Sequence, residues 1–277
     1  MFYGGKIKKY MNSINNIFKK FIHPILLHGT KLFDNCRLRV ANENSIAQIS
    51  EPIIFVVNHS NGHDFPMAAQ AIKTHFYILA DFTMKKDPIV NSLNRLNGCV
   101  YVDRKNTESK KQSKEVLIKH LNKGHNILLF PEGTWNLHPS KLLLPLNWGC
   151  IDLSKETNAP IVPITILYRG NQAYVNIGEP FFPIKDKQTE IIVLEELMST
   201  LLWKSMCLFE PMKREMLPND YEEQFIKEQL QTYKKLDLQY EKSVIRDIGN
   251  NYNDFTHLNI IEPKMQNAFL FNKRLKG

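Results

Sequence analysis

The chain has 277 residues, 43% of them hydrophobic, and a formal net charge of +8 at pH 7, enough for one large or two small domains with a hydrophobic core. Its four cysteines lie far apart and form no Cys-x-x-Cys pair, which argues against a zinc site or disulfide scaffold and for a reducing compartment. No apolar run approaches the roughly 18 residues of a membrane-spanning helix, and no signal peptide is evident. We therefore expect a protein that is cytosolic or lies on a membrane surface.

The first 39 residues carry most of the positive charge, with eight lysines and arginines against a single acidic residue, Asp34. Between residues 7 and 25, apolar residues recur at steps of three and four, and lysines and asparagines fill the other face. This pattern is typical of a helix lying in a membrane interface, although the stripe could instead pack on the core. We expect residues 1–34 to form an amphipathic basic arm on an anionic membrane surface. Nucleic acid is not expected as a partner, because no recognised motif accompanies the charge.

From residue 37 onward, apolar runs alternate with helix-like segments. Strands are predicted at 38–41, 53–57, 76–80, 99–102, 126–130, 161–167 and 173–177. Helices are predicted at 67–73, 89–96, 109–122, 149–157 and 190–204. This alternation predicts an α/β fold with a mainly parallel central sheet and helices on both faces, which we assign to residues 35–210. Residues 211–277, with a helix-prone stretch at 219–246, are expected to form a helical C-terminal extension without chemistry.

One polar stretch, Asn-His-Ser-Asn-Gly-His-Asp at 58–64, follows the apolar run that predicts the second strand. Ligands bind beyond the carboxyl ends of strands in open α/β sheets, so His59 is a candidate catalytic base. Asp64 can turn back to accept a hydrogen bond from one ring nitrogen, which leaves an acceptor hydroxyl as the nucleophile. The alternatives are a purely structural His–Asp contact or a phosphohydrolase metal site built on His63 and Asp64. Because the other histidines lack ordered spacing, no metal is expected.

Two further strands end in polar residues. Arg104 follows the strand at 99–102, and its guanidinium could bind phosphate oxygens in a bidentate fork or form an ordinary surface ion pair. The strand at 126–130 leads into a Pro-Glu-Gly-Thr turn in which Gly133 lets the backbone approach a ligand closely. Glu132 in this turn could bind ligand hydroxyls or pair with Arg104, or the turn could be an ordinary strand exit. Pro163 has a shaping role in its strand.

Taken together and in this order, these segments resemble the four sequence blocks of the glycerolipid acyltransferase family, which includes the 1-acylglycerol-3-phosphate acyltransferases. The His-x4-Asp block is His59 to Asp64, and Gly-x-x-x-x-Asp-Arg lies at 98–104. Phe-Pro-Glu-Gly-Thr lies at 130–134, and Val-Pro-Ile lies at 162–164. The resemblance covers about residues 35–210 and includes the spacing between the blocks.

The resemblance implies that His59 is the general base, that Asp64 orients it, and that the thioester is attacked without an acyl-enzyme. Arg104 would bind the acceptor phosphate, and Glu132, Gly133 and Thr134 would form the acceptor-binding turn. The acceptor would be a lysolipid, and the donor would be acyl-CoA, acyl carrier protein or an acyl phosphate, with no further cofactor. Such an enzyme would lie on the cytoplasmic side of a membrane as a peripheral or monotopic protein.

The sequence also departs from the family pattern. Trp135 and Asn136 stand where the family often has Arg and Ser, and Trp148 precedes Gly149 where a lysine is often found. Lys141 could compensate in part. The lost arginine leaves open a less charged acceptor, such as a glycolipid or another lysolipid, or an inactive lipid-binding peripheral protein. The tryptophans would suit an acyl chain or a sugar face, or could be ordinary core residues.

Overall fold

The computed structural model describes residues 36–41, 52–86, 91–92, 97–136, 141–210, 214–221 and 224. The expected arm at 1–34 lies outside the described residues, as does the helix expected at 89–96 apart from residues 91 and 92. Most of the expected C-terminal extension also lies outside them. Among the helices described, none combines the length and apolar character needed to cross a bilayer.

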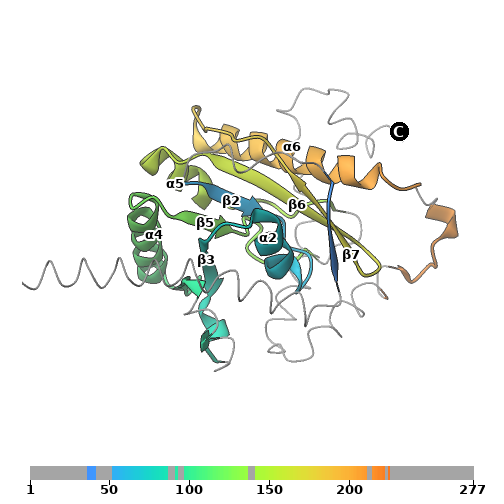
Figure 1. Cartoon of the computed structure of the whole chain (residues 1–277), viewed down its shortest axis with the longest axis horizontal. Coiled ribbons are helices and arrows are strands. Elements are labelled where there is room, and N and C mark those ends of the chain that lie inside the picture. Colours follow the sequence, from blue (N-terminus) through green and yellow to red (C-terminus); the bar gives the residue numbers. More distant parts are fainter. Residues whose placement is uncertain are drawn as a thin grey trace, which may run out of the picture.

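A seven-stranded sheet forms the centre of the described fold (Figure 1) and has the strand order β1-β7-β6-β2-β5-β3-β4. The five strands from β6 to β4 are mutually parallel, whereas β7 is antiparallel to β6 and β1 is parallel to β7. This confirms the mainly parallel sheet. The strands are β1 (Arg37–Val40), β2 (Ile54–Val57), β3 (Phe76–Asp81), β4 (Cys99–Val102), β5 (Asn126–Leu129), β6 (Ile161–Arg169) and β7 (Gln172–Ile177).

Helices cover both faces of the sheet, as predicted. In the described part of the chain, the bounded α-helices are α2 (Asp64–Ile72), α4 (Thr107–Leu121), α5 (Gly149–Thr157) and α6 (Lys187–Met206). The 3-10 helices there are η2 (Phe82–Lys86) and η3 (Arg214–Met216). The central strand β2 is buried on both sides: Phe55 and Val57 pack in the same cluster as Met67 of α2. Ile54 and Val56 pack in the cluster that contains residues of α4, α5 and α6. Both layers of the core therefore meet at β2, which ends at Val57, two residues before His59.

The helix after β2 begins earlier than predicted. It was expected at 67–73, but α2 starts at Asp64 and is followed by Lys73 in a left-handed conformation with φ +63°. Pro66 fits in the first turn, where the missing N–H removes no intrahelical hydrogen bond. The early start makes Asp64 the first residue of α2, with its carboxylate beside the loop that connects β2 to α2.

Candidate active site

Three of the predicted sequence blocks meet at one edge of the sheet. His59 follows β2, Glu132 follows β5, and Arg104 follows β4. These three strands run in the same direction. In the sheet, β5 lies next to β2, and only β3 separates it from β4. Parallel strands bring their carboxyl ends to the same edge, which is where open α/β sheets bind ligands.

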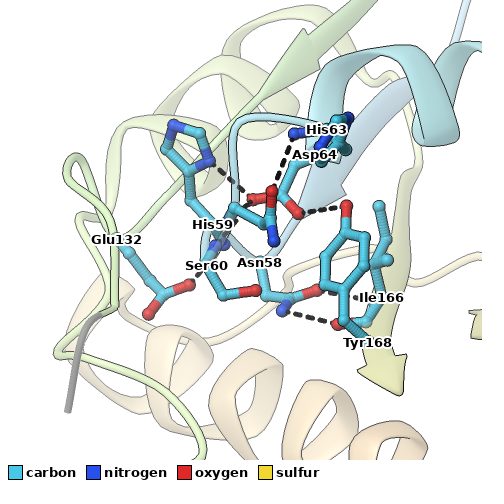
Figure 2. A network of polar contacts seen from close by, with 9 residues as sticks. Asn58, His59, Ser60, His63, Asp64, Glu132, Ile166 and Tyr168 are labelled. Atoms are coloured by element: carbon cyan, nitrogen blue, oxygen red, sulfur yellow. Dashed lines mark hydrogen bonds and ion pairs between the residues drawn. The ribbon is translucent and has the colours of Figure 1, made fainter. Parts of the chain in front are cut away.

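His59 and Asp64 form the predicted pair. The Nδ1 atom of His59 lies 2.8 Å from Oδ2 of Asp64, and the imidazole side chain is 21% exposed while the Asp64 side chain is 0% exposed. Figure 2 shows the other ring nitrogen, Nε2, on the side of the ring away from Asp64. Because a carboxylate only accepts hydrogen bonds, the proton belongs on Nδ1, which leaves the Nε2 lone pair available as a base.

Backbone and side-chain donors fix the Asp64 carboxylate. Oδ2 accepts the backbone N–H groups of Ser60 at 2.6 Å and Asn61 at 2.8 Å, in addition to the His59 ring. Oδ1 accepts the hydroxyl of Tyr168 at 2.7 Å (Figure 2). A buried carboxylate is tolerated only when it is paired in this way.

The metal-site alternative gains no support from this arrangement. The backbone N–H of His63 donates to Oδ1 of Asn61 at 3.1 Å, and both oxygens of Asp64 are already engaged by donors. Within the ranges that the structure describes, no group of three or more His, Cys, Asp or Glu residues is placed to hold a metal ion.

Two aromatic side chains contact the imidazole ring of His59. The ring of His59 stacks on Phe130 with centroids 4.1 Å apart and planes 20° apart. Trp135 meets the same ring edge-on at 5.7 Å and is 8% exposed. These contacts restrict ring rotation and add dispersion energy to the pair. The residue that departs from the family pattern at 135 is therefore a wall of the His59 site.

The side chain of Glu132 contacts the backbone of His59 and is almost fully buried. Its Oε1 accepts the backbone N–H of His59 at 2.7 Å, and its Oε2 accepts the backbone N–H of Leu144 at 2.8 Å. Burial raises the pKa of Glu132 from 4.5 to about 8, against the lowering effect of these two hydrogen bonds. The alternative that Glu132 pairs with Arg104 is wrong, since its oxygens engage backbone groups instead. Its part in binding the acceptor stays a prediction.

Arg104 lies against the Glu-Gly-Thr turn, as the combined blocks required. Gly133 has φ +75°, and a Cβ added there would lie 3.0 Å from Nη1 of Arg104 and 2.9 Å from Nδ2 of Asn147. Only glycine allows both this backbone conformation and this close approach. The guanidinium also lies near Asp81, with Nε 3.8 Å from Oδ2, and its side chain is 45% exposed. Much of its binding surface therefore remains accessible.

The remaining predicted residues occupy different surroundings. Thr134 is half-buried and follows Gly133 in the same turn, so its role in acceptor binding stays a prediction. The Lys141 carbonyl accepts the side-chain amide of Asn136 at 3.1 Å. Trp148 is 48% exposed, with Nζ of Lys187 lying 4.8 Å from its ring centroid, so it is not a core tryptophan.

Two residues of the site were not predicted. The side chain of Asn58 forms two hydrogen bonds with the backbone of Ile166: Oδ1 accepts the N–H at 2.7 Å, and Nδ2 donates to the carbonyl at 3.1 Å. This pair extends the β2–β6 ladder beyond the last backbone pair, Val57 with Ile164. Tyr168, two residues later on β6, then reaches Asp64. The sequence offered one signal for the position of Tyr168, because residues 164, 166 and 168 alternate onto the same face of their strand.

The model of the acyltransferase family matches residues 37–167, which include β1 to β5, His59, Arg104 and most of β6. This region is therefore similar to the acyltransferase family, in line with the resemblance of its sequence blocks. It contains most of the candidate site, including the turn at Gly133.

Two curated relatives and one solved structure extend this finding. The chain is 25% identical over 156 residues to an uncharacterized acyltransferase of Schizosaccharomyces pombe, covering 54% of this chain and 56% of the relative. It is 28% identical over 123 residues to a 1-acyl-sn-glycerol-3-phosphate acyltransferase of Borreliella burgdorferi, covering 44% and 48% respectively. The chain thus spans about half the length of these relatives. The crystal structure of the LPA acyltransferase PlsC from Thermotoga maritima shares the fold, with TM-score 0.52, 20% identity, and coverage of 77% of this chain and 86% of that chain.

Proposed function

We propose that this protein transfers a fatty acyl group from an acyl thioester to a hydroxyl of a lysophospholipid such as 1-acylglycerol-3-phosphate. The observation that carries the proposal is the His59–Asp64 pair, a fixed base with a partly exposed ring, at the same sheet edge as the Arg104 guanidinium. The family match and the similarity to the 1-acyl-sn-glycerol-3-phosphate acyltransferase of Borreliella burgdorferi support this reaction class. The donor would be carried by CoA or acyl carrier protein.

The geometry supports a direct transfer in which His59 is the general base. Nε2 would take the proton from the acceptor hydroxyl while the oxygen bonds to the thioester carbonyl carbon. As the carbon–sulfur bond breaks, the imidazolium would return this proton to the leaving sulfur, which releases a free thiol and the new ester. Asp64 would hold the proton on Nδ1 and stabilise the imidazolium.

We assign the acceptor headgroup to the Arg104 side of the site. The guanidinium offers several N–H donors and lies against the Gly133 turn, with nearly half of its side-chain surface exposed. It is suited to a phosphate. Trp135 occupies the position where the family often has a second cation, so a less charged acceptor, such as a glycolipid or another lysolipid, is the second candidate.

The test is a screen of purified full-length protein with lysolipid acceptors of graded headgroup charge, each with acyl-CoA and acyl carrier protein donors, followed by mass spectrometry. We expect a product whose mass equals the acceptor plus one acyl group, with one free thiol released for each product. If no acceptor yields product and no thioester is consumed, the protein is an inactive lipid-binding protein and the proposal is wrong.

We further propose that the basic segment 1–34 holds the protein on an anionic membrane surface on the cytoplasmic side. The charge asymmetry of the sequence supports this assignment, and each lysine near such a surface contributes about 1 kcal/mol. Flotation with anionic and with neutral vesicles would compare the full chain with a variant in which Lys6, Lys8, Lys9, Lys19 and Lys20 are replaced by Gln.

The matched control replaces five lysines elsewhere, namely Lys105, Lys110, Lys111, Lys119 and Lys123, by Gln. We expect weaker binding to anionic vesicles only when the N-terminal lysines are replaced, with the largest difference at low salt because salt screens exposed charges. Equal binding by both variants at low salt would refute the role of this segment.

A further inference from the structure

Among the residues that the structure describes, the hydroxyl of Tyr168 is the one hydrogen-bond donor to the Asp64 carboxylate that comes from a distant part of the sequence. It donates to Oδ1 of Asp64 at 2.7 Å, across a sequence separation of 104 residues. The other donors, from His59, Ser60 and Asn61, all bind Oδ2 and all belong to the loop that precedes α2 (Figure 2). Tyr168 therefore binds Oδ1, the carboxylate oxygen that receives no hydrogen bond from the loop.

The position of the Tyr168 side chain is set by strand β6 and by packing of its ring, and does not depend on its hydroxyl. β6 continues to Arg169, beyond the point where β2 ends at Val57. Where β6 extends past the end of β2, the buried side chain of Asn58 takes the place of a neighbouring strand by binding both the N–H and the carbonyl of Ile166. Residues two apart on a strand share a face, so Tyr168 lies on the α2 side with Ile166, and its ring packs against the core cluster there. A phenylalanine at this position would keep the same ring packing.

We infer that Tyr168 is a positioning residue that, acting through Asp64, keeps His59 in the tautomer required for the proposed acyl transfer. With both oxygens held, the carboxylate has one orientation, in which Oδ2 faces Nδ1 of the imidazole. Without the hydroxyl, Oδ1 becomes a buried acceptor that lacks its donor, and rotation of the carboxylate becomes favourable. The bond to Nδ1 then weakens, and the ring populates the tautomer with its proton on Nε2, which cannot accept the proton of a hydroxyl.

The kinetic test uses full-length Tyr168→Phe, which removes only the hydroxyl. Because the defect lies in the base and not in substrate binding, we expect kcat to fall by about tenfold while KM for the acceptor stays within about twofold. The matched control is Tyr174→Phe on the neighbouring strand, whose hydroxyl donates to Gln172 at 2.8 Å. This control should leave both constants unchanged. An unchanged kcat in Tyr168→Phe, or a rise in KM alone, would overturn the inference.

A double-mutant cycle with Asp64→Asn separates positioning from a general structural effect. If Tyr168 acts through Asp64, adding Tyr168→Phe to Asp64→Asn should cost less than about twofold more, because the energies of coupled residues do not add. A full additional tenfold loss in the Asp64→Asn background would show that Tyr168 acts by another route.

Nuclear magnetic resonance of protein labelled with ¹⁵N-histidine provides a readout that needs no activity. The wild-type protein should show His59 protonated on Nδ1, whereas Tyr168→Phe should show a population protonated on Nε2, and Tyr174→Phe should match the wild type. Identical His59 signals in all three proteins would overturn the inference. If the wild-type protein transferred no acyl group but the Tyr168→Phe signals changed, the proposed function would fail while the positioning role would stand.

Discussion

The two halves of the candidate site are held in different ways. The His59 half is rigid, with the Asp64 side chain 0% exposed and donors on both carboxylate oxygens. The Arg104 half is open, with the arginine side chain 45% exposed and its Asp81 partner 32% exposed at 3.8 Å. Proton transfer requires atoms placed within a narrow range, whereas recognition of a charged headgroup tolerates adjustment. Under the proposed function, we expect the His59 half to set the rate and the Arg104 half to select the acceptor.

Asp64→Asn should have the largest effect, because it removes the carboxylate on which all the hydrogen bonds around His59 Nδ1 converge. An amide cannot favour the correct tautomer of His59 or stabilise the imidazolium, so we expect kcat to fall by about 10³-fold or more. KM for both substrates should change little. Steady-state kinetics measure both constants, and Asp152→Asn is the matched control, at an aspartate whose side chain is 31% exposed and whose Oδ2 lies 4.0 Å from Nζ of Lys114. A large rise in KM with unchanged kcat would place Asp64 in substrate binding.

Arg104→Ala should have a smaller and different effect. Removal of the guanidinium should raise KM for a phosphate-bearing acceptor by roughly 10- to 100-fold and leave KM for the donor unchanged. The effect should shrink at high ionic strength, because the guanidinium is exposed. Lys105→Ala, which removes the neighbouring charge, is the control. If KM for the donor rises instead, the open half binds the thioester and the division between the halves is wrong.

Glu132→Gln should have the smallest effect on chemistry and a measurable effect on stability. Burial raises the pKa of Glu132 in the folded protein to about 8, above its value of 4.5 in the unfolded chain. The folded state therefore holds a proton that the unfolded state has lost, and Glu132 lowers stability progressively as pH rises from about 4.5 to about 8. The slope from this group is at most about 1.4 kcal/mol per pH unit.

Urea unfolding between pH 5 and pH 8 checks this prediction. Near pH 5, Glu132→Gln should be less stable than the wild type, because one of the two backbone N–H groups loses its acceptor. Its stability should depend less on pH, so the difference should shrink or reverse toward pH 8. The exposed Glu179→Gln should keep the wild-type slope. An unchanged slope in Glu132→Gln would mean that the buried carboxyl is ionised across this range.

Local sequence was sufficient to predict much of this molecule. The run Ile-Ile-Phe-Val-Val at 53–57 is buried on both faces, which is why it predicts a central parallel strand without alternation. His59 and Asp64 are five residues apart, so a single turn can join them. A Gly-Asn turn at 170–171, with Gly170 at φ +56°, joins β6 to the antiparallel β7 and is a recognisable hairpin signal.

Contacts that depend on strand order could not be predicted in this way. Tyr168 reaches Asp64 only because β6 lies beside β2, and Phe130 stacks on His59 only because β5 lies on the other side of β2. Periodicity gives the face of a residue but not its neighbouring strand. The contact of Glu132 with the backbone N–H of Leu144, in a later loop, could not be predicted either, and it replaces the expected alternative of a pair with Arg104.

The most direct test of the central claim compares His59→Ala with His63→Ala in the same acyl-transfer assay, with circular dichroism to confirm that both variants are folded. We predict that His59→Ala forms no acylated lysolipid above the rate without enzyme, whereas His63→Ala retains transfer. Transfer at the wild-type rate by folded His59→Ala would contradict the assignment of His59 as the base.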